Sequence, residues 1–521
     1  MKASGNPNLR TPIKHMVKSS GGLVTAQHWL AAQAGANALS NGANAIDAAV
    51  TAAFSLSVVE PWLSGIGGCG YMMIYSARDQ RVRTVNFGTK SPQQLNPLDY
   101  PIVHHNDDEW FNWPKVKDDR NLFGYPSICV PSFIAGLSMA LECFGTISWQ
   151  DAIAPAIEQA ERGLPVDWFL SLSIAGESKG LGVFESTRKT FLPNGVVPVS
   201  GSVNDKSLLF FRPLAQTLRR LAQHGAQDFY HGKLARDIVA DLQAGGNTMT
   251  LNDLSSYRAE IGEPLSLQYR DVTLHTAGIM TGGPGLMMAM DTLAQSNFYK
   301  KEFGSEAVLA QTTAIRKAYK DRLGQLDNDS CTSHVNVIDA DGNIAALTVT
   351  LLSRFGSKVV LPSTGILMNN GLMWFNPSAG TSNSIRPSGQ PLANMCPVIG
   401  TKEGQPHLAI GAAGGRQIMP AIVQILSYLF DFEMTLEDAF HHPRVSAEQE
   451  PVRCNTTMKP NHIASLARQF AVTQVEDSVY PIQFAVPSAI LHDQKTGENY
   501  GMAHVNSPWS AAIAAPLTPQ K

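Results

Sequence analysis

The chain has 521 residues, of which 44% are hydrophobic and 16% are charged, and its formal net charge at pH 7 is −3. Forty basic residues against forty-three acidic ones leave no electrostatic footprint for nucleic acid or an anionic membrane surface. No run of eighteen apolar residues predicts a transmembrane helix, and the N-terminus lacks the apolar stretch of a signal peptide. We therefore expect a cytoplasmic globular enzyme that binds neither nucleic acid nor membrane.

The first 125 residues alternate between strand and helix patterns. Residues 17–58 predict a strand followed by two helices whose apolar faces are built from small residues. A glycine-rich turn at 64–70 then leads into a hairpin that ends near residue 88. Residues 101–125 are polar and aromatic, which indicates an inserted loop.

Helical periodicity dominates from residue 131 to about 330. Two apolar stripes carry it, namely Leu214, Leu218, Leu221 and Ala222, and then Leu234, Ile238 and Leu242. Residues 333–430 return to strand patterns separated by Asp-Gly, Asn-Asn-Gly and Gly-Gly turns, and a mixed segment runs to 515. No repeat or linker separates these regions, so we expect one compact body.

A glycine pattern at residues 65–70 (GIGGCG) matches the spacing of a dinucleotide-binding loop. That loop needs a helix directly after it, because the helix N-terminus binds the pyrophosphate. Here a strand pattern (YMMIYS) follows, and no acidic residue stands about twenty positions further on. The pattern therefore favours a tight turn with close backbone approach.

Other short motifs lack the context that their chemistry requires. Residues 186–189 match SxxK and residues 495–497 match KTG of the penicillin-binding enzymes, but no SDN lies between them. The histidine pairs at 104–105 and 441–442 are adjacent in sequence, so their side chains point apart. The six cysteines include no CxxC pair. We expect no metal ion and no organic cofactor.

The stretch from 327 to 357 contains a hairpin with an unusual start. Its first strand pattern ends at Asp341-Gly342, which predicts a two-residue type I′ turn and a return strand. This register pairs Ser333 with Thr350 and places Thr332 within one step of Thr350. Two hydroxyl groups and a thiol, that of Cys331, would then gather at the open end of the hairpin.

Cleavage of the chain before Thr332 would turn its hydroxyl into an effective nucleophile. A threonine hydroxyl is a weak nucleophile and needs an adjacent base. Breaking the Cys331–Thr332 bond would create an α-amine on Thr332, whose usual pKa of about 7.7–8.0 leaves part of it unprotonated at neutral pH. Nucleophile and base would then belong to one residue. The alternative is an uncut hairpin in a catalytically silent binding protein.

Long, ordered blocks of the chain are similar to one known family. They comprise the opening block at 16–75, a helical block at 213–258, TGGPG at 281–285, TSHVNVIDADGN at 332–343, and the segments at 355–375, 391–397 and 411–418. Together they resemble the γ-glutamyltranspeptidase family of N-terminal-nucleophile hydrolases. The resemblance implies an α+β fold, a four-layer αββα sandwich made as a precursor.

The resemblance also implies how the precursor is processed. The large fragment would comprise residues 1–331 and the small one 332–521, both held in one body, and a dimer of this processed pair stays open. Thr332 would be the nucleophile and Thr350 its supporting threonine. The backbone N–H groups of Gly414 and Gly415 would form the oxyanion hole, which stabilises the charge developing on the substrate oxygen.

Four polar contacts that the family makes to an amino-acid substrate are lost or changed here. Gly88 stands where the family has the arginine that pairs with the glutamyl α-carboxylate. Leu352 replaces an asparagine, and Trp374 replaces the acid that binds the α-amine. The serine pair has become Ala393-Asn394. We infer that γ-glutamyl compounds are not the natural substrate.

New positive charges indicate what the pocket could bind instead. Arg354 follows the return strand, Arg416 follows the oxyanion glycines, and Lys90 lies near the lost arginine. With Asn394 to orient it, the expected substrate is a small amide carrying a carboxylate, and the resemblance suggests oxamate, hydrolysed to oxalate and ammonia in purine catabolism. The alternatives are a γ-glutamyl hydrolase or transferase acting on glutathione-like compounds and a cephalosporin-type acylase.

Overall fold

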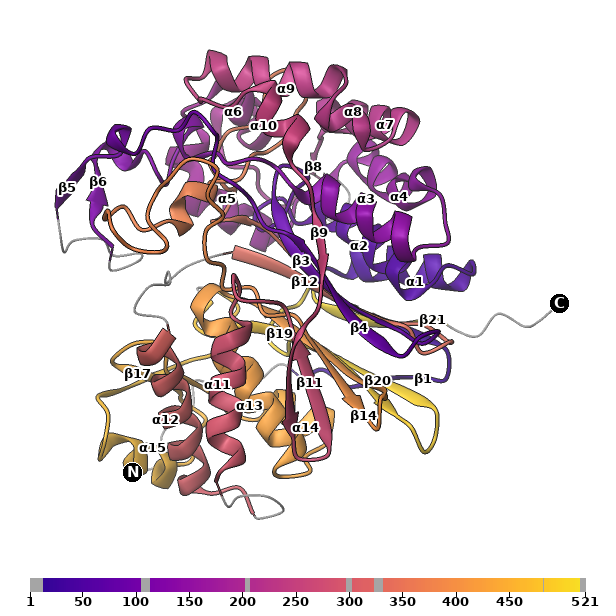
Figure 1. Cartoon of the computed structure of the whole chain (residues 1–521), viewed down its shortest axis with the longest axis vertical. Coiled ribbons are helices and arrows are strands. Elements are labelled where there is room, and N and C mark those ends of the chain that lie inside the picture. The colour runs from indigo at the N-terminus through magenta and orange to yellow at the C-terminus, as the bar shows by residue number, and fades with distance from the viewer. Residues whose placement is uncertain are drawn as a thin grey trace.

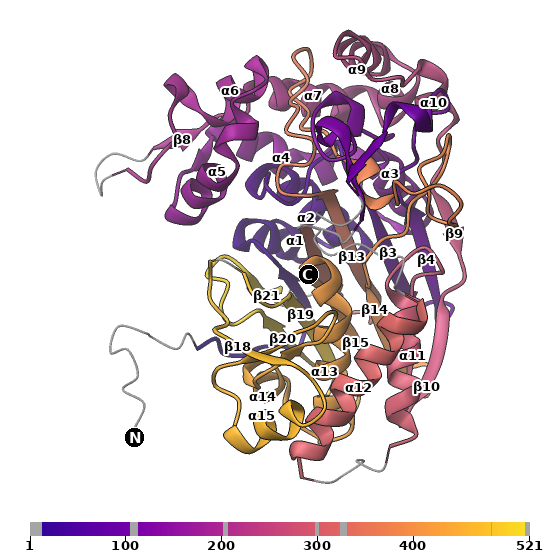
Figure 2. The ribbon, with the colours of Figure 1, turned by 90° about the vertical axis from the view of Figure 1, so that its left-hand side faces the viewer.

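The computed structural model describes residues 13–104, 113–201, 207–296, 302–322, 331–480 and 482–515. Two seven-stranded sheets lie face to face in the middle of the molecule, and helices cover both outer surfaces (Figure 1). Figure 2 shows the molecule from another side, with the helices of residues 133–256 in its upper half and those of residues 283–322 and 418–467 in its lower half. This is the expected α+β, four-layer αββα arrangement in one compact body.

The predicted hairpin lies at the centre of the first sheet. The strand order of this sheet is β21 (Ala511–Ala515), β2 (Gly22–Ala26), β12 (Cys331–Ile338), β13 (Ile344–Leu352), β3 (Cys69–Ser76), β4 (Arg81–Phe87) and β9 (Glu260–Gly262). Every pairing in it is antiparallel. Because β12 and β13 are hydrogen-bonded to β2 and β3, a chain cut before residue 332 would keep both fragments in one sheet.

The second sheet faces the first. Its strand order is β1 (Val17–Ser19), β20 (Glu498–Ala503), β19 (Val486–Asp493), β15 (Gln405–Ala413), β14 (Val398–Lys402), β11 (Val272–Thr276) and β10 (Leu265–Tyr269). Shorter strands lie outside both sheets, namely β5 (Ile102–His104), β6 (Lys115–Val116), β7 (Leu164–Pro165), β8 (Leu208–Leu209), β16 (Val445–Ser446), β17 (Val452–Asn455) and β18 (Val472–Val475). The inserted loop predicted at 101–125 contains β5 and β6.

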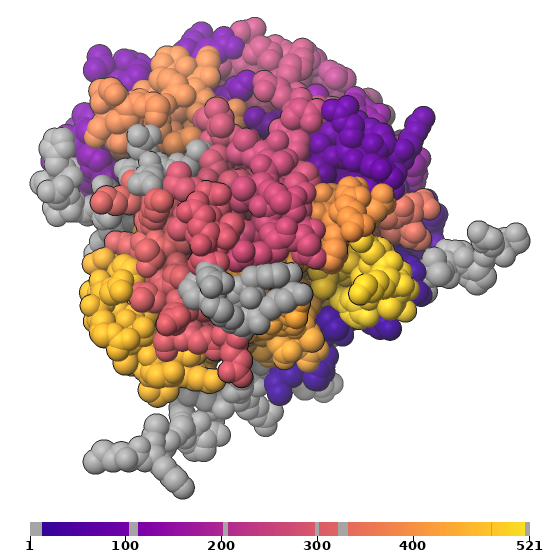
Figure 3. Space-filling model, turned by 60° about the horizontal axis from the view of Figure 1, so that its bottom comes forward, coloured from indigo at the N-terminus to yellow at the C-terminus, as the bar shows by residue number. Residues whose placement is uncertain are grey.

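Two groups of helices form the outer layers. On the side of the first sheet lie α1 (Trp29–Ser40), α2 (Ala45–Val59), α3 (Phe133–Phe144), α4 (Trp149–Arg162), α5 (Trp168–Leu181), α6 (Glu185–Phe191), α7 (Arg212–His224), α8 (Gln227–Tyr230), α9 (Lys233–Ala244) and α10 (Leu251–Ser256). On the side of the second lie α11 (Gly283–Ala294), α12 (Ser305–Arg322), α13 (Ile418–Phe430), α14 (Leu436–His441) and α15 (Pro460–Ala467). Figure 3 shows residues of the 265–322 region, in pink to red, spread over the face beside the yellow C-terminal part.

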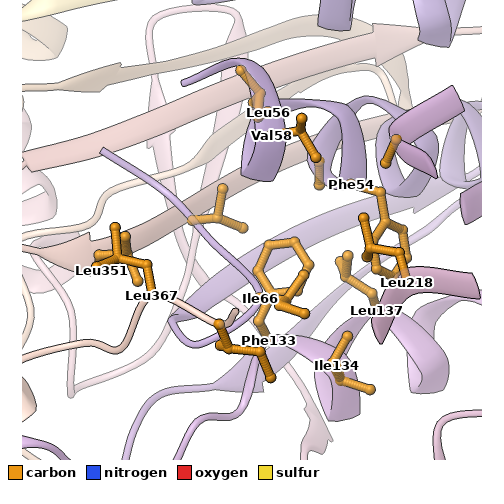
Figure 4. Packing of buried hydrophobic residues seen from close by; sticks show 14 of the residues in the cluster. Phe54, Leu56, Val58, Ile66, Phe133, Ile134, Leu137, Leu218, Leu351 and Leu367 are labelled. Atoms are coloured by element: carbon orange, nitrogen blue, oxygen red, sulfur yellow. The ribbon is translucent and has the colours of Figure 1, made fainter. Parts of the chain in front are cut away.

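The helix α2 is the centre of the largest core cluster. All fifteen of its residues are buried, as its run of small apolar residues predicts. Phe54 from this helix packs edge-on against Phe133 of α3 with ring centroids 5.6 Å apart, and Leu218 of α7 joins the same cluster (Figure 4). Burial of this kind contributes roughly 25 cal/mol per Å² of apolar surface, so α2 is fixed firmly against the first sheet.

Two regions differ from the elements predicted along the chain. Residues 260–276 form β9, β10 and β11 inside the stretch expected to be helical, and residues 418–430 form the helix α13 inside the stretch expected to be strands. All residues of α13 are buried. Because it has no exposed polar face, its mostly apolar sequence resembles that of a buried strand. Within the described residues, no helix combines the length and the apolar character needed to cross a membrane.

The turn between β12 and β13 corrects the predicted hairpin. Ile338 pairs with Ile344, and Ser333 pairs with Val349 instead of Thr350. The predicted type I′ turn is wrong, because Gly342 has a φ of +85° while Asp341 has no positive φ, and type I′ requires both. The Asp339 carboxylate causes this: Oδ1 accepts the N–H groups of Asp341 (3.0 Å) and Asn343 (2.9 Å), which stabilises a longer turn.

A buried polar chain joins the two sheets beneath the start of β12. His334 Nδ1 lies 2.8 Å from Thr348 Oγ1, and His334 Nε2 lies 2.9 Å from Asn336 Oδ1. Asn336 Nδ2 donates to the carbonyl oxygen of Ser488 in the second sheet at 3.0 Å. Burial lowers the pKa of His334 to about 4, so its ring is neutral at physiological pH.

We predict that this neutral histidine makes the protein sensitive to acid. Its ordinary pKa of 6.5 exceeds the folded value, so the unfolded chain binds more protons and stability is lost as pH falls from 6.5 towards 4. His28 and His504, whose pKa values burial lowers to about 3, act in the same direction. The apparent Tm should fall between pH 7 and pH 5. His334→Gln should show a shallower fall, and an equal slope in both proteins would contradict this assignment.

The glycine-rich turn before β3 brings backbone against backbone, as predicted from residues 65–70. A Cβ atom at Gly68 would lie 2.1 Å from the carbonyl oxygen of Thr350, and one at Gly67 would lie 2.3 Å from that of Leu367. The strand β3 follows the turn, so the dinucleotide-binding arrangement is absent from this described segment. The turn instead packs directly on the strand that carries Thr350.

Substitution of Gly68 should therefore be costly. We expect Gly68→Ala to destabilise the protein by about 1–3 kcal/mol, the usual cost of overpacking, because the obstacle is backbone that cannot rotate away. The apparent Tm measured by differential scanning fluorimetry reports the loss. Gly278→Ala is the matched control, since a Cβ atom there meets no atom within 4 Å. Equal Tm values for both variants would show that the turn can relax.

Candidate active site

Thr332 has a fully buried hydroxyl near the start of β12. Its side chain is 0% exposed, and Oγ1 has no hydrogen-bond partner in the described part of the chain. Buried polar atoms nearly always have partners in folded proteins, and the exceptions cluster at functional sites. The hydroxyl is thus available for a reacting partner. Residues 323–330, which precede the predicted cleavage site, lie outside the described residues.

An irregularity in the β12–β13 ladder places this hydroxyl. Cys331 pairs with Leu352 while Ser333 pairs with Val349, so Thr350 and Leu351 both oppose Thr332. Bulges of this kind redirect a side chain and are common next to active sites. The Oγ1 atom of Thr350 accepts the N–H of Leu352 at 2.8 Å. Thr350 therefore lies across the ladder from Thr332, in the position expected of a supporting residue.

Gly414 and Gly415 lie at the same end of the sandwich. They follow β15, and the His334 ring, two residues on from Thr332, lies against Gly411 of that strand, where a Cβ atom would come within 2.2 Å of Cε1. Gly414 has a φ of +127°, which side-chain-bearing residues rarely adopt. Gly415 begins a short 3₁₀ helix, so its N–H has no acceptor within that helix. This arrangement suits an oxyanion hole.

The position of the lost arginine is occupied by neutral polar groups. A Cβ atom at Gly88 would lie 2.3 Å from Gln390 Nε2 and 2.7 Å from Tyr71 Oη. Gln390 Nε2 donates to Tyr71 Oη at 2.7 Å and to Asn86 Oδ1 at 3.2 Å. The space for a guanidinium group is therefore filled by an amide and a phenol, neither of which can neutralise a carboxylate.

The remaining departures from the family pattern gather in the core between the sheets. Leu352, Trp374 and Ala393 are each at most 1% exposed and belong to the cluster that also contains Tyr71. The indole Nε1 of Trp374 is buried without a hydrogen-bond partner among the described residues. Asn394, which is 5% exposed, follows Ala393. The family's head-group pocket is thus apolar here and offers an N–H donor where the family has an acid.

The three cations expected near the site have different surroundings. Arg416 Nη2 donates to the carbonyl oxygen of Glu448 at 3.0 Å, and its guanidinium lies 5.1 Å from the Tyr319 ring centroid. Lys90 Nζ lies 5.6 Å from the Tyr257 ring centroid. Arg354 lines a cavity of ≈ 40 Å³, and its Nη1 atom is buried without a hydrogen-bond partner in the described structure.

This cavity, which we call the Arg354 cavity, lies beside the reaction centre. Its wall includes the aromatic residues Trp62, Phe169 and Trp509 and the polar residues Gln27, Glu60 and His504. Glu60 Oε2 accepts the hydroxyl of Ser333, next to Thr332, at 2.5 Å. Val486, also in the wall, follows Ala485, against which Gly414 packs. The cavity therefore borders the neighbours of both the candidate nucleophile and the glycine pair.

Sequence reasoning missed Glu60 and Gln390. Glu60 directly follows the apolar helix α2, in which Asp47 is the one charged residue. An acid at the end of so apolar a segment is a signal in the sequence that could have indicated a buried functional carboxyl group. Gln390 is far from Gly88 in sequence, and its contact comes from folding alone.

The histidine pairs have structural surroundings where they are described. His441 Nδ1 contacts the carbonyl oxygen of Glu437, and the His442 ring packs against Phe303. His105 lies outside the described residues. Across the described ranges, no three His, Cys, Asp or Glu side chains are grouped so that they could hold a metal ion.

Comparison with known proteins identifies the family. The family model of gamma-glutamyltranspeptidase matches residues 31–331 and 324–512. The glutathione hydrolase proenzyme of Bacillus subtilis (strain 168) is 27% identical over 504 aligned residues, which cover 85% of this chain and 84% of the relative. The acylase ACY 1 proenzyme of Pseudomonas sp. (strain V22) is 31% identical over 479 aligned residues, which cover 84% of each chain.

Solved structures share the fold. The crystal structure of the cephalosporin acylase from Bacillus halodurans superposes with a TM-score of 0.84 at 22% identity and covers 98% of both chains. The γ-glutamyltranspeptidase of Helicobacter pylori gives a TM-score of 0.51 at 27% identity and covers 57% of this chain and 81% of its own. The chain therefore belongs to the γ-glutamyltranspeptidase family and is an autoprocessing amide hydrolase of the N-terminal-nucleophile type.

Proposed function

We propose that the protein hydrolyses a small amide that carries a carboxylate, and that oxamate, converted to oxalate and ammonia, is this substrate. The observation that carries the proposal is the buried, unpartnered Nη1 atom of Arg354 in a small cavity beside the reaction centre. A guanidinium group with a free donor in a buried site is a natural partner for a carboxylate. The amide of the same molecule would then extend towards Thr332.

The size of the Arg354 cavity favours a short substrate. One water molecule needs roughly 10–15 Å³ on the same measure, so ≈ 40 Å³ holds a group of a few atoms. A carboxylate attached directly to an amide has this size, whereas a glutamyl chain is longer and charged at both of its α-substituents. The aromatic wall would exclude water from the bound group, which strengthens its electrostatic contacts.

The proposed reaction uses residues of this chain alone. After cleavage of the Cys331–Thr332 bond, the α-amine of Thr332 takes the proton of its own hydroxyl, and Oγ1 attacks the amide carbonyl. The N–H groups of Gly414 and Gly415 bind the resulting oxyanion. The amine gives this proton to the amide nitrogen as the C–N bond breaks, and ammonia leaves. A water molecule, deprotonated by the same amine, then attacks the acyl ester, and Oγ1 leaves with the proton returned by the amine. Asn394 would orient the substrate.

Relatives of this chain favour a second candidate, a γ-glutamyl hydrolase or a cephalosporin-type acylase. Two of these relatives are a glutathione hydrolase proenzyme and an acylase ACY 1 proenzyme. Against a glutamyl substrate stand Gly88, whose surroundings are filled by Gln390, and Trp374 in the place of an acid. Loss of one hydrogen bond to a charged group of the substrate weakens the binding free energy by about 1.5–3 kcal/mol. Glutathione should therefore be bound poorly.

The processing step gives the first test. Intact-mass measurement of mature protein should show two fragments of about 36 and 20 kDa, the shares of the 56.2 kDa chain held by residues 1–331 and 332–521. Thr332→Ala should remain one chain and release no ammonia, because it has neither the nucleophile nor the cleavage that frees the base. Cys331→Ala should keep its turnover once cut. Amide hydrolysis by Thr332→Ala, or full activity of an uncut wild-type chain, would refute the nucleophile assignment.

Substrate preference gives the second test. Ammonia release from oxamate should exceed turnover of glutathione and of glutaryl amides at equal concentration. Arg354→Gln should raise the KM for oxamate by about 10- to 100-fold with a smaller change in kcat, the value of one charged hydrogen bond. Arg212→Gln is the matched control, since the Arg212 guanidinium lies 5.3 Å from the Phe210 ring centroid, just as that of Arg354 lies 5.4 Å from the Tyr480 ring centroid. Rapid glutathione turnover, or an unchanged KM in Arg354→Gln, would contradict the substrate proposal.

A further inference from the structure

Two carboxylic acids connect the ends of α2 to the strand that carries Thr332. At the N-terminal end, Asp339 Oδ2 accepts the N–H of Ala45 at 2.9 Å, just beyond the last residue of β12. At the C-terminal end, Glu60 Oε2 accepts the Ser333 hydroxyl at 2.5 Å. Glu60 is 5% exposed and Ser333 is 0% exposed. The second contact therefore lies entirely in the protein interior, one residue from the nucleophile.

The backbone around Thr332 is held less completely than the rest of β12. Its pairing with β2 covers Val335 to Ile338, and the ladder to β13 is irregular between Cys331 and Ser333. Cleavage before Thr332 would also remove the covalent restraint on one side. A chain end with one regular neighbour strand tends to fray. The Glu60–Ser333 contact is the side-chain restraint that opposes such fraying.

Glu60 itself is rigidly placed. Its N–H donates to the carbonyl oxygen of Leu56 at 2.9 Å, and its carbonyl oxygen accepts the N–H groups of Leu63 (3.0 Å) and Ser64 (3.2 Å). Because α2 is buried along its whole length, the carboxyl group cannot move away without disturbing the core. Glu60 can thus act as a fixed point for the strand end.

We propose that Glu60 is a positioning residue that holds, through the Ser333 hydroxyl, the new N-terminus of the small fragment in place for catalysis. This inference rests on the proposed role of Thr332.

Two ionisable groups share the Arg354 cavity with Glu60, namely Arg354 after β13 and His504 after β20. Asp477 Oδ1 lies 4.0 Å from His504 Nε2. Asp477 Oδ2 also pairs with Arg444 Nη2 at 3.5 Å.

The charge of Glu60 matters because the freed α-amine must be neutral to act as a base. Burial raises the pKa of Glu60 to about 8, although the Ser333 hydrogen bond lowers it, and burial lowers that of His504 to about 3. Below pH 8 both groups are therefore uncharged. An ionised Glu60 near the chain end would favour the ammonium form of the amine, and the two groups would titrate together. A neutral carboxyl avoids this competition.

The test compares substitutions of Glu60 in the full-length protein. Glu60→Ala should lower kcat for ammonia release by about tenfold or more, because it removes the acceptor and leaves the Ser333 hydroxyl unpaired. Glu60→Gln keeps a neutral acceptor and should restore most of kcat. In the wild type Glu60 ionises near pH 8, where its carboxylate would stabilise the ammonium form of the amine. Glu60→Gln lacks this carboxylate, so its midpoint on the acidic side of the kcat/KM profile should lie roughly half a pH unit or more below that of the wild type.

A matched control separates catalysis from folding. Asp339→Asn alters the corresponding contact at the opposite end of α2, and the pKa of Asp339 is also raised by burial. This variant should keep the wild-type midpoint of the pH profile even where its Tm falls. Ser333→Ala removes the other partner and should reproduce the loss of kcat in Glu60→Ala, which keeps the inference testable if Glu60→Ala does not fold.

The outcomes distinguish this inference from the proposed function. If Thr332→Ala is inactive, Ser333→Ala keeps wild-type kcat and Glu60→Gln keeps the wild-type pH midpoint, the role of Glu60 is refuted while the nucleophile stands. If Thr332→Ala is active, the proposed function fails first. Loss of kcat in Ser333→Ala, together with recovery and a shifted midpoint in Glu60→Gln, supports the positioning role.

Discussion

The fold is organised around β12, the strand that carries the buried side chain of Thr332. The hydroxyl of Thr332 is buried between two sheets with no partner in the described structure, and a buried hydroxyl in that state is unfavourable by about 1–3 kcal/mol. The surroundings maintain it because they are rigid: Gly68 packs on the backbone of Thr350, and the His334 ring fills the space over Gly411. A reacting group that binds this hydroxyl would relieve the unfavourable state, which is how a preorganised site favours its reaction.

Specificity follows from which polar contacts this rigid frame supplies. In the family pattern an arginine and an acid bind the charged groups of a glutamyl substrate. Here Gln390 fills the space at Gly88, and Trp374 brings an indole into the core. Replacing an acid by an N–H donor reverses the preference from a cation to an oxygen acceptor. Arg354 supplies, in its own cavity, the positive charge that the first pocket lacks. The proposed binding site of the carboxylate is therefore the Arg354 cavity.

The helix α2 links these features mechanically. It is buried over its full length, and its two ends reach β12 through Asp339 and Glu60. The same helix end contributes Glu60 to the wall of the Arg354 cavity. The Glu60 carboxyl group therefore contacts both the Arg354 cavity and the strand end at Ser333. It is uncharged at neutral pH because burial raises its pKa.

Local patterns in the sequence determined the order of most elements, the tight turn before β3 and the chemistry expected of Thr332, because spacing and residue type act over short distances. They did not determine the exact hairpin register, since the Asp339 carboxylate rather than Asp341-Gly342 sets the turn. They also failed for α13, because a helix buried on every side has the mostly apolar sequence that is also expected of a buried strand. Only the tertiary structure decided which candidate cation borders the reaction centre and that Glu60 meets Ser333, because both depend on residues hundreds of positions apart that the two stacked sheets bring to one end of the sandwich.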